Sequence, residues 1–414
     1  MKFLHIADLH FGKTIHGVSL IESGDQPAWA DRFLALAADI KPDAVLIAGD
    51  VYDRSSPSGD AVELLSRFLT GLVNLGIPVL MIAGNHDSGQ RLSFGGELLA
   101  RANLHIAGGL GKGGSIPRVT LRDEFGPVNF YLMPYIFPAL AQEALGDAEI
   151  RDYDAAVRRI LAAQDIHADE RNVILAHQNV TESGVEHEQG GSESMVGGLG
   201  QVDYTAFDMF DYAALGHIHA AYPVGRPGVR FAGSPLCYHF NETKQAKKGP
   251  LLVTMGKKGE ELTIETLAVE PLHPMREMKG PYEELRDELL SSDARGEYLK
   301  IVLTDQRITP ETSGFLRELC ESRESVLMDL KSEFSDFSGT AGAAEMEEIR
   351  GRSLTELFSG FYAERNSGAE IDEEDLHFLK CAEELAERAD INEKPSDADV
   401  LRLLGELIGK EAEI

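Results

Sequence analysis

A short apolar run that ends in a polar side chain occurs five times in this sequence. Residues 45–48 form an apolar run rich in aliphatic side chains (VLIA), which Gly49 and Asp50 follow. Such a run predicts a buried strand. Open α/β sheets place their ligand sites at the carboxyl ends of such strands. The repetition therefore favours a fold in which several strands end at one common edge.

The other four occurrences lie at residues 3–10, 79–87, 173–177 and 212–219. In a parallel sheet these strand ends would meet at one edge. The seven polar side chains collected there would be Asp8, His10, Asp50, Asn85, His177, His217 and His219.

The chemistry of these side chains predicts a site for two metal ions. Imidazole and carboxylate ligands together suit manganese, iron or zinc, whereas calcium and magnesium prefer oxygen alone. Seven ligands are too many for one ion, and Asp50 is the natural bridge between two. Two close cations would bind a phosphate oxygen and lower the pKa of a bridging water. His86 could then act as a general acid, with Asp53 or Asp87 holding its tautomer.

The alternative is that these histidines are structural or solvated, as a lone histidine at a strand end usually is. We apply that reading to His105, His167, His187 and His239. Asp8 and His10 taken alone would leave the choice open, and His177 stands without a motif of its own. The GNHD motif at residues 84–87, together with GHIH at residues 216–219 and Gly49-Asp50, favours the metal site.

The order of predicted elements divides the chain into three parts. Residues 1–272 alternate strands and helices, which is typical of a layered α/β core. Strand signals at residues 229–232 and 251–255 predict a second, antiparallel-leaning sheet, and therefore a sandwich. Residues 275–332 predict a small α+β domain of three strands and two helices. Beyond a small, polar segment, residues 345–414 predict a helical tail.

The formal net charge of −30 argues against a general nucleic-acid binder. Contacts with DNA would have to be local, and metal ions would have to offset the repulsion. Lys244, Lys247 and Lys248 form the best basic patch, and a solubilising turn is the alternative. On the acidic tail, an apolar stripe at helical spacing predicts a partner-binding surface, unless it packs on its own domain: Leu354, Leu357, Phe358, Phe361 and Tyr362.

The cysteines and the hydropathy indicate where the chain works. Cys237, Cys320 and Cys381 are isolated, with neither zinc-site spacing nor a disulfide framework. A reducing cytoplasm is therefore the expected compartment. Apolar stretches are too short for a membrane span, and we expect neither a signal peptide nor a membrane partner.

Five motifs of this sequence resemble those of the calcineurin-like metallophosphoesterases. They are Asp8 with His10, GDVYD at residues 49–53, GNHD at 84–87, His177, and GHIH at 216–219. The segments at residues 16–20, 91–94, 197–203, 210–215 and 233–236 are similar to the SbcD family, the nuclease components of bacterial SbcCD complexes. The resemblance covers nearly the whole chain. It implies a four-layer α/β/β/α sandwich with a small cap domain and a helical tail.

The resemblance also implies a division of roles. One ion would be held by Asp8, His10, Asp50 and His219, and the other by Asp50, Asn85, His177 and His217. His86 would be the catalytic histidine. The ions would be two Mn²⁺, with Mg²⁺ or another divalent ion as the alternative.

For activity, the family implies a 3′→5′ exonuclease on double-stranded DNA and an endonuclease on single strands and hairpins, in DNA repair and recombination. The partner would be an SMC-like ATPase of the SbcC type, which the tail would grip. ATP would be used by that partner, and this chain would bind no nucleotide. Helices at residues 61–75 and 92–102 would form a homodimer. The alternatives are a phosphoesterase acting on nucleotides or small phosphodiesters, and a non-catalytic scaffold at DNA ends.

Overall fold

The strands that end at candidate ligands lie in two six-stranded sheets. The first sheet has the order β16 (Thr263–Thr266), β15 (Leu251–Thr254), β1 (Lys2–Ile6), β4 (Ala44–Ala48), β5 (Val79–Ile82), β6 (Leu104–Ala107). The second has the order β13 (Pro223–Val224), β14 (Arg226–Phe231), β12 (Tyr212–Gly216), β9 (Arg171–His177), β8 (Gly126–Met133), β7 (Arg118–Asp123). The central strands are parallel in both sheets.

This description comes from a computed structural model of the chain. It covers residues 1–182, 200–244 and 248–334, with six single residues beyond them. The chain divides into two units, Met1–Phe334 and Ser335–Ile414. Among the helices so described, none is long and apolar enough to cross a bilayer.

Alternating side chains of each central strand enter different cores. In β4, Leu46 and Ala48 belong to the core between the two sheets. Val45 and Ile47 belong to the core beneath the helices. This explains why β4 is apolar throughout, since a strand covered on both faces has no side that faces water.

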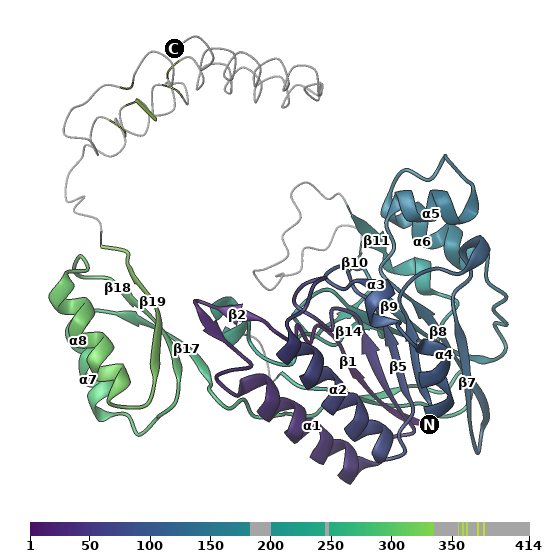
Figure 1. Ribbon diagram of the computed structural model, residues 1–414, viewed down its shortest axis with the longest axis horizontal. Helices are drawn as coiled ribbons and strands as arrows, with labels where there is room; N and C mark the ends of the chain where they lie inside the picture. Colours follow the sequence, from purple (N-terminus) through teal and green to yellow (C-terminus); the bar gives the residue numbers. More distant parts are fainter. Residues whose placement is uncertain are drawn as a thin grey trace. The chain divides into compact units, whose positions relative to one another are not determined.

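Helices cover the outer faces of both sheets (Figure 1). The first sheet packs against α1 (Asp25–Ile40) and α2 (Gly59–Asn74), which bury residues such as Trp29, Phe33 and Phe68. The second packs against α5 (Pro138–Leu145) and α6 (Tyr153–Ala162), whose Val157 and Ile160 are fully buried. The four-layer α/β/β/α arrangement is therefore confirmed.

Two predictions about this core are wrong. Residues 229–232 and 251–255 do not pair as one antiparallel sheet, because β14 runs parallel to β12 and β15 pairs with β1 in the other sheet. Strand periodicity shows which face is buried but cannot assign a strand to a sheet. The expected helix at residues 92–102 is interrupted: α3 (Gly89–Leu92) and α4 (Gly96–Leu99) are separated around Gly95, which has a φ of 71°.

Residues 275–332 contain the expected order of three strands and two helices. The strands β17 (Met275–Gly280), β18 (Tyr298–Leu303) and β19 (Val326–Ser332) pair in parallel. Helices α7 (Tyr282–Ser291) and α8 (Pro310–Glu321) connect them and lie side by side (Figure 1). Leu289, Ile301 and Leu316 belong to a hydrophobic cluster of this segment's own. This cluster supports our proposal of a domain boundary between residues 272 and 275.

Asp25, at the start of α1, joins this segment to the core. Its buried carboxylate accepts hydrogen bonds from the Tyr298 hydroxyl at 2.6 Å and the His273 backbone N–H at 3.1 Å. Nδ1 of His273 lies 3.0 Å from the same group. One carboxylate thus binds both the connecting segment and strand β18.

Tyr298→Phe is expected to weaken this attachment without disturbing either core. The variant removes one hydrogen bond to a charged group, a loss of about 1.5–3 kcal/mol. Limited proteolysis of residues 268–274 should become faster, which gel analysis would show. Tyr282→Phe is the matched control, because that hydroxyl makes no hydrogen bond within the described residues. Equal cleavage rates in all three proteins would contradict the role of Asp25.

Candidate metal centre

The candidate ligands lie on loops at the carboxyl ends of the central strands of both sheets. These loops are joined to one another by backbone hydrogen bonds. The Asp8 N–H donates to the Gly49 carbonyl at 3.1 Å, and the His10 N–H donates to the Asp50 carbonyl at 2.9 Å. The His217 N–H, from the second sheet, donates to the Asp8 carboxylate at 3.0 Å. Hydrogen bonds between the loops thus fix their positions relative to one another.

Four candidate ligands have a left-handed or otherwise positive backbone φ. The values are 54° for Asp8, 43° for His10, 48° for Asp50 and 99° for His217. Residues other than glycine rarely adopt such angles, and each costs on the order of 1–3 kcal/mol. Strain of this kind persists only where the surrounding structure imposes it, and it often marks functional sites.

The small residues next to the candidate ligands are required by close packing. A Cβ atom on Gly84 would lie 2.1 Å from Oδ1 of Asp50. A Cβ atom on Gly49, which has a φ of 88°, would lie 2.4 Å from Nδ1 of His177. No real Cβ contact is this short, so only glycine allows these side chains to approach one another.

Asp50 lies at the centre of the cluster and is completely buried. Its Oδ1 accepts a hydrogen bond from the His86 N–H at 2.9 Å. Its Oδ2 accepts no hydrogen bond within the described residues, and lies 3.3 Å from Nε2 of His177 and 3.7 Å from Nε2 of His10. A buried carboxylate oxygen without a donor is costly, and a cation at this position would satisfy it.

Two groups of donor atoms flank Asp50. On one side, Nε2 of His10 and Nε2 of His219 face each other at 3.2 Å, and both rings form a buried group with Asp8. On the other side, Oδ1 of Asn85 lies 3.0 Å from Nε2 of His177 and 3.1 Å from Nδ1 of His217. All seven side chains predicted as ligands therefore come together, and the donor set fits two divalent cations.

His177 presents only one ring nitrogen to this cluster. Its Nδ1 lies 2.7 Å from the Ala48 carbonyl and donates to it, which leaves Nε2 directed at Asp50 and Asn85. Burial alone would lower the pKa of His177, but the charge of Asp50 raises this pKa to about 10. The carboxylates thus strongly favour positive charge here, so protons and metal ions would compete for the same atoms.

His86 is more accessible than the six buried candidate ligands, with 37% of its side chain exposed, and among the seven candidates only Asn85 is also exposed. Its Nδ1 lies 2.9 Å from the backbone carbonyl of Asp53, and its Nε2 lies 4.0 Å from Oδ2 of Asp50. Asp53 therefore orients His86 through its carbonyl and not through its carboxylate, which pairs with Lys13 at 2.8 Å.

Asp87 does not contact the His86 ring in the way we predicted. Its carboxylate instead accepts three backbone hydrogen bonds, from Val51 at 3.1 Å, Tyr52 at 2.9 Å and Gly84 at 2.9 Å. These bonds join the Asp50 loop to the Asn85 loop. The role of Asp87 is thus to shape the loops, and sequence proximity alone wrongly suggested the contact with His86.

Comparisons with known proteins identify the family of this chain. A family model described as calcineurin-like phosphoesterase matches residues 1–221. A model described as the type 5 capsule protein repressor C-terminal domain matches residues 271–366. The SbcD component of the SbcCD nuclease from Staphylococcus saprophyticus is 32% identical over 309 residues, which are 73% of this chain and 78% of the relative. The chain belongs to the SbcD family.

A second SbcD relative and one solved structure complete these findings. The protein of the same name from Staphylococcus epidermidis is 30% identical over 309 residues, which are 74% of this chain and 79% of that protein. A β-glucosidase from Micrococcus antarcticus covers 80% of this chain and 83% of its own, with 11% identity and a TM-score of 0.19, too low to support any argument. As a member of the SbcD family, this chain is a metal-dependent phosphoesterase, and so a hydrolase.

The basic patch predicted for this SbcD-family chain is only partly described. Lys244 is exposed, and Lys247 lies outside the described residues. The Lys248 ammonium lies 2.8 Å from the Glu242 carboxylate and donates to the His219 carbonyl at 2.8 Å. Lys248 is therefore internal to the site and is corrected from a candidate DNA contact to a supporting residue.

The apolar stripe on the tail falls largely outside the described residues. Leu354, Leu357 and Phe361 are not described. Phe358 is exposed and Tyr362 is half-buried. The partner-binding role of the stripe stays a prediction.

Several residues that support the ligands were not predicted from the sequence. Gln26 donates to the His10 carbonyl at 2.7 Å, and the Tyr238 hydroxyl donates to the Leu9 carbonyl at 2.7 Å. Glu242 contacts Nδ1 of His219 at 3.4 Å. Burial would raise the pKa of Glu242, but the hydrogen bond from His219 and the charge of Lys248 lower it to about 2. No local spacing marks such residues, because each lies far from its partner in the chain.

Proposed function

We propose that this chain is a manganese-dependent DNA nuclease that works with an SMC-like ATPase of the SbcC type. The observation that carries this proposal is the shared carboxylate: Oδ2 of Asp50 lies between two groups of donor atoms and accepts no hydrogen bond within the described residues. Asp50 and these donor groups would together hold two divalent ions, which would supply chemistry suited to in-line displacement at a phosphodiester. Both Staphylococcus relatives are named as part of the SbcCD nuclease, which supports DNA as the substrate.

The proposed roles follow the donor groups on either side of Asp50. Asp8, His10 and His219 would hold one ion, while Asn85, His177 and His217 would hold the other. The bound ions would supply an activated water and stabilise negative charge on phosphate oxygens. Imidazole donors with carboxylates suit Mn²⁺ better than Mg²⁺.

His86 would protonate the leaving oxygen. The Asp53 carbonyl holds Nδ1 of His86 as the donor nitrogen, so Nε2 is the nitrogen left to exchange a proton with the substrate. Because this ring is partly exposed beside Asp50, a phosphodiester can reach it. In this proposal His86 is the only catalytic residue that is not a ligand.

We further propose 3′→5′ cutting of duplex ends and endonuclease cutting of single strands and hairpins, in DNA repair and recombination in the cytoplasm. A homodimer is supported by two exposed apolar side chains near α4, Phe94 at 85% and Leu98 at 68% exposure. Exposed apolar surface often marks an interface. The tail would hold the ATPase partner, giving a two-plus-two complex.

A nuclease assay with two substrates tests this function. The full chain with Mn²⁺ is expected to cut an end-labelled duplex and to hydrolyse bis-p-nitrophenyl phosphate, and chelation should stop both. Hydrolysis of the small ester alone would indicate a phosphodiesterase of nucleotides or small molecules. Neither activity would indicate a scaffold at DNA ends. Repeating the assay with a co-purified ATPase, with and without ATP, tests the proposed partner.

A further inference from the structure

Glu242 is a buried carboxylate behind the candidate ligand His219. It lies in the short helix η5 (Phe240–Lys244) and is 1% exposed. Its Oε1 lies 3.4 Å from Nδ1 of His219, on the opposite side of the ring from Nε2, which faces His10. Both carboxylate oxygens of Glu242 accept further hydrogen bonds. The donors are the backbone N–H groups of Tyr238 at 3.3 Å and His239 at 3.1 Å, and the Ser234 hydroxyl at 3.2 Å.

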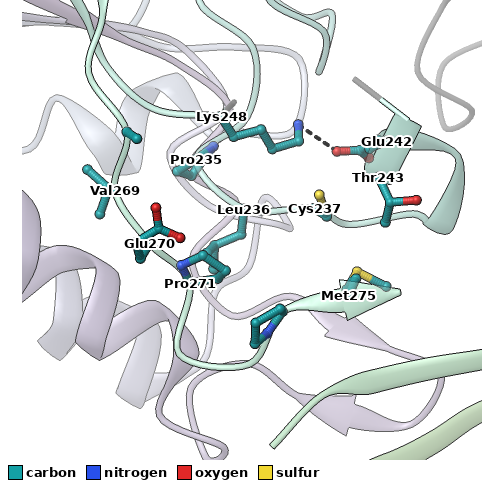
Figure 2. A pocket seen from close by; sticks show the side chains of 12 residues that line it. Pro235, Leu236, Cys237, Glu242, Thr243, Lys248, Val269, Glu270, Pro271 and Met275 are labelled. Atoms are coloured by element: carbon teal, nitrogen blue, oxygen red, sulfur yellow. Dashed lines mark ion pairs between the residues drawn. The ribbon is translucent and has the colours of Figure 1, made fainter. Parts of the chain in front are cut away.

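Lys248 completes this arrangement from the other side of the loop. Its ammonium forms an ion pair with Oε2 of Glu242 at 2.8 Å, drawn as the dashed line in Figure 2. The same ammonium donates to the His219 carbonyl at 2.8 Å and to the Ser234 hydroxyl at 2.7 Å. The pair therefore holds His219 at two points, the ring through Glu242 and the backbone through Lys248.

A cavity adjoins this pair where the core meets the segment that begins at residue 275. Its volume is about 230 Å³, and its lining includes Glu242, Lys248, Cys237 and Met275 (Figure 2). The carboxylate is nevertheless completely enclosed by its own contacts, with a side-chain exposure of 0%. Glu242 therefore interacts with buried groups of the protein and is not a surface carboxylate.

An imidazole that donates from Nδ1 has an unprotonated Nε2, and only that nitrogen can bind a cation. For His177 the acceptor is the neutral Ala48 carbonyl. For His219 it is a charged carboxylate at 3.4 Å, whose negative charge favours the tautomer protonated on Nδ1 and increases the basicity of the ring. A carboxylate buried to this degree would be costly unless paired, which accounts for Lys248.

We propose that Glu242, paired with Lys248, is a positioning residue that fixes the ring and tautomer of His219 for metal binding. This inference rests on the proposed role of His219 as a ligand. The effect should be confined to the ion held by Asp8, His10 and His219. The ion on the Asn85 side has a separate set of supporting contacts.

Equilibrium binding of Mn²⁺ to the full chain, followed by electron paramagnetic resonance of the free ion, tests the proposal. Glu242→Leu removes the acceptor and should weaken one of two Mn²⁺ sites by roughly 10–100-fold. Glu242→Gln keeps an acceptor oxygen without the charge and should lie between that variant and the wild type. Lys248→Met should weaken the same site. Lys258→Met is the matched control. It removes an ion pair of 2.9 Å between Lys258 and Asp211, which lies away from the cluster.

Nitrogen chemical shifts of the His219 ring in the metal-free protein give a readout that is independent of activity. Protonated Nδ1 and bare Nε2 are expected in the wild type, and a shift toward the other tautomer in Glu242→Leu. Unchanged shifts together with unchanged Mn²⁺ affinity at both sites would overturn the proposal. Equal weakening of both sites would also overturn it, because that result indicates a general packing role. Since neither readout uses DNA, failure of DNA cutting would count against the proposed function alone.

Discussion

His86→Ala is expected to leave both Mn²⁺ ions bound and to lower phosphodiester cleavage by a factor on the order of 100 to 10,000. The loss corresponds to removal of a general acid, because His86 is assigned to proton transfer and not to coordination. Mn²⁺ content by elemental analysis and initial rates of duplex DNA cleavage are the two measurements. His167→Ala is the control, since that ring is 55% exposed and pairs only with Asp165 among the described residues.

The choice of substrate sharpens this test. Because p-nitrophenolate leaves readily without a proton, the defect of His86→Ala should be larger on DNA than on the activated ester. A variant that has lost an ion would instead be defective on both substrates to a similar degree. Loss of Mn²⁺ from His86→Ala would show that His86 is a ligand, and would refute its assigned role.

Asp50→Ala is expected to lose both ions together, whereas loss of any other single ligand should affect one ion more than the other. The reason is that Oδ2 of Asp50 lies within 4 Å of imidazoles from both donor groups. We expect Mn²⁺ affinity to fall by at least about 100-fold at each site, more than for loss of a supporting residue. Equilibrium dialysis with elemental analysis measures this.

A second substitution separates ligand loss from backbone strain. Alanine at the φ of 48° found for Asp50 is unfavourable, whereas asparagine tolerates this conformation. Asp50→Asn should therefore unfold like the wild type and still bind Mn²⁺ weakly at both sites. Asp31→Ala, in an exposed ion pair with Arg67, is the control. Retention of one tightly bound ion in Asp50→Asn would exclude a bridging role.

The sequence was sufficient to predict which side chains come together at the candidate site because each motif is local. Asp50 follows an apolar run directly, and the glycines beside Asp50 and Asn85 are explained by contacts of 2.1 to 2.4 Å that any Cβ would make. The same local reading predicted each strand and helix of residues 275–332. These features depend on neighbouring residues, which is the information that periodicity carries.

Contacts between distant residues were beyond that reading. Lys248 appeared to be part of a basic surface loop, but its nearest acid is Glu242, and both support a histidine more than twenty residues earlier. Asp53 was assigned through its side chain, while the structure uses its carbonyl. Residue spacing does not indicate which sheet a strand joins. It also does not indicate whether an aspartate contacts a histidine through its backbone carbonyl or its side-chain carboxylate.

Four candidate ligands have positive φ angles: Asp8, His10, Asp50 and His217. At these positions the side chain that catalysis requires is not the one that gives the most stable backbone. Glycine is the residue that adopts such angles at least cost, yet glycine carries no donor atom. Selection for heat resistance alone would therefore favour relief of this strain even where it removes a donor atom, and the resulting variants would lose activity. Selection for stability in this protein has to include a step that requires bound metal.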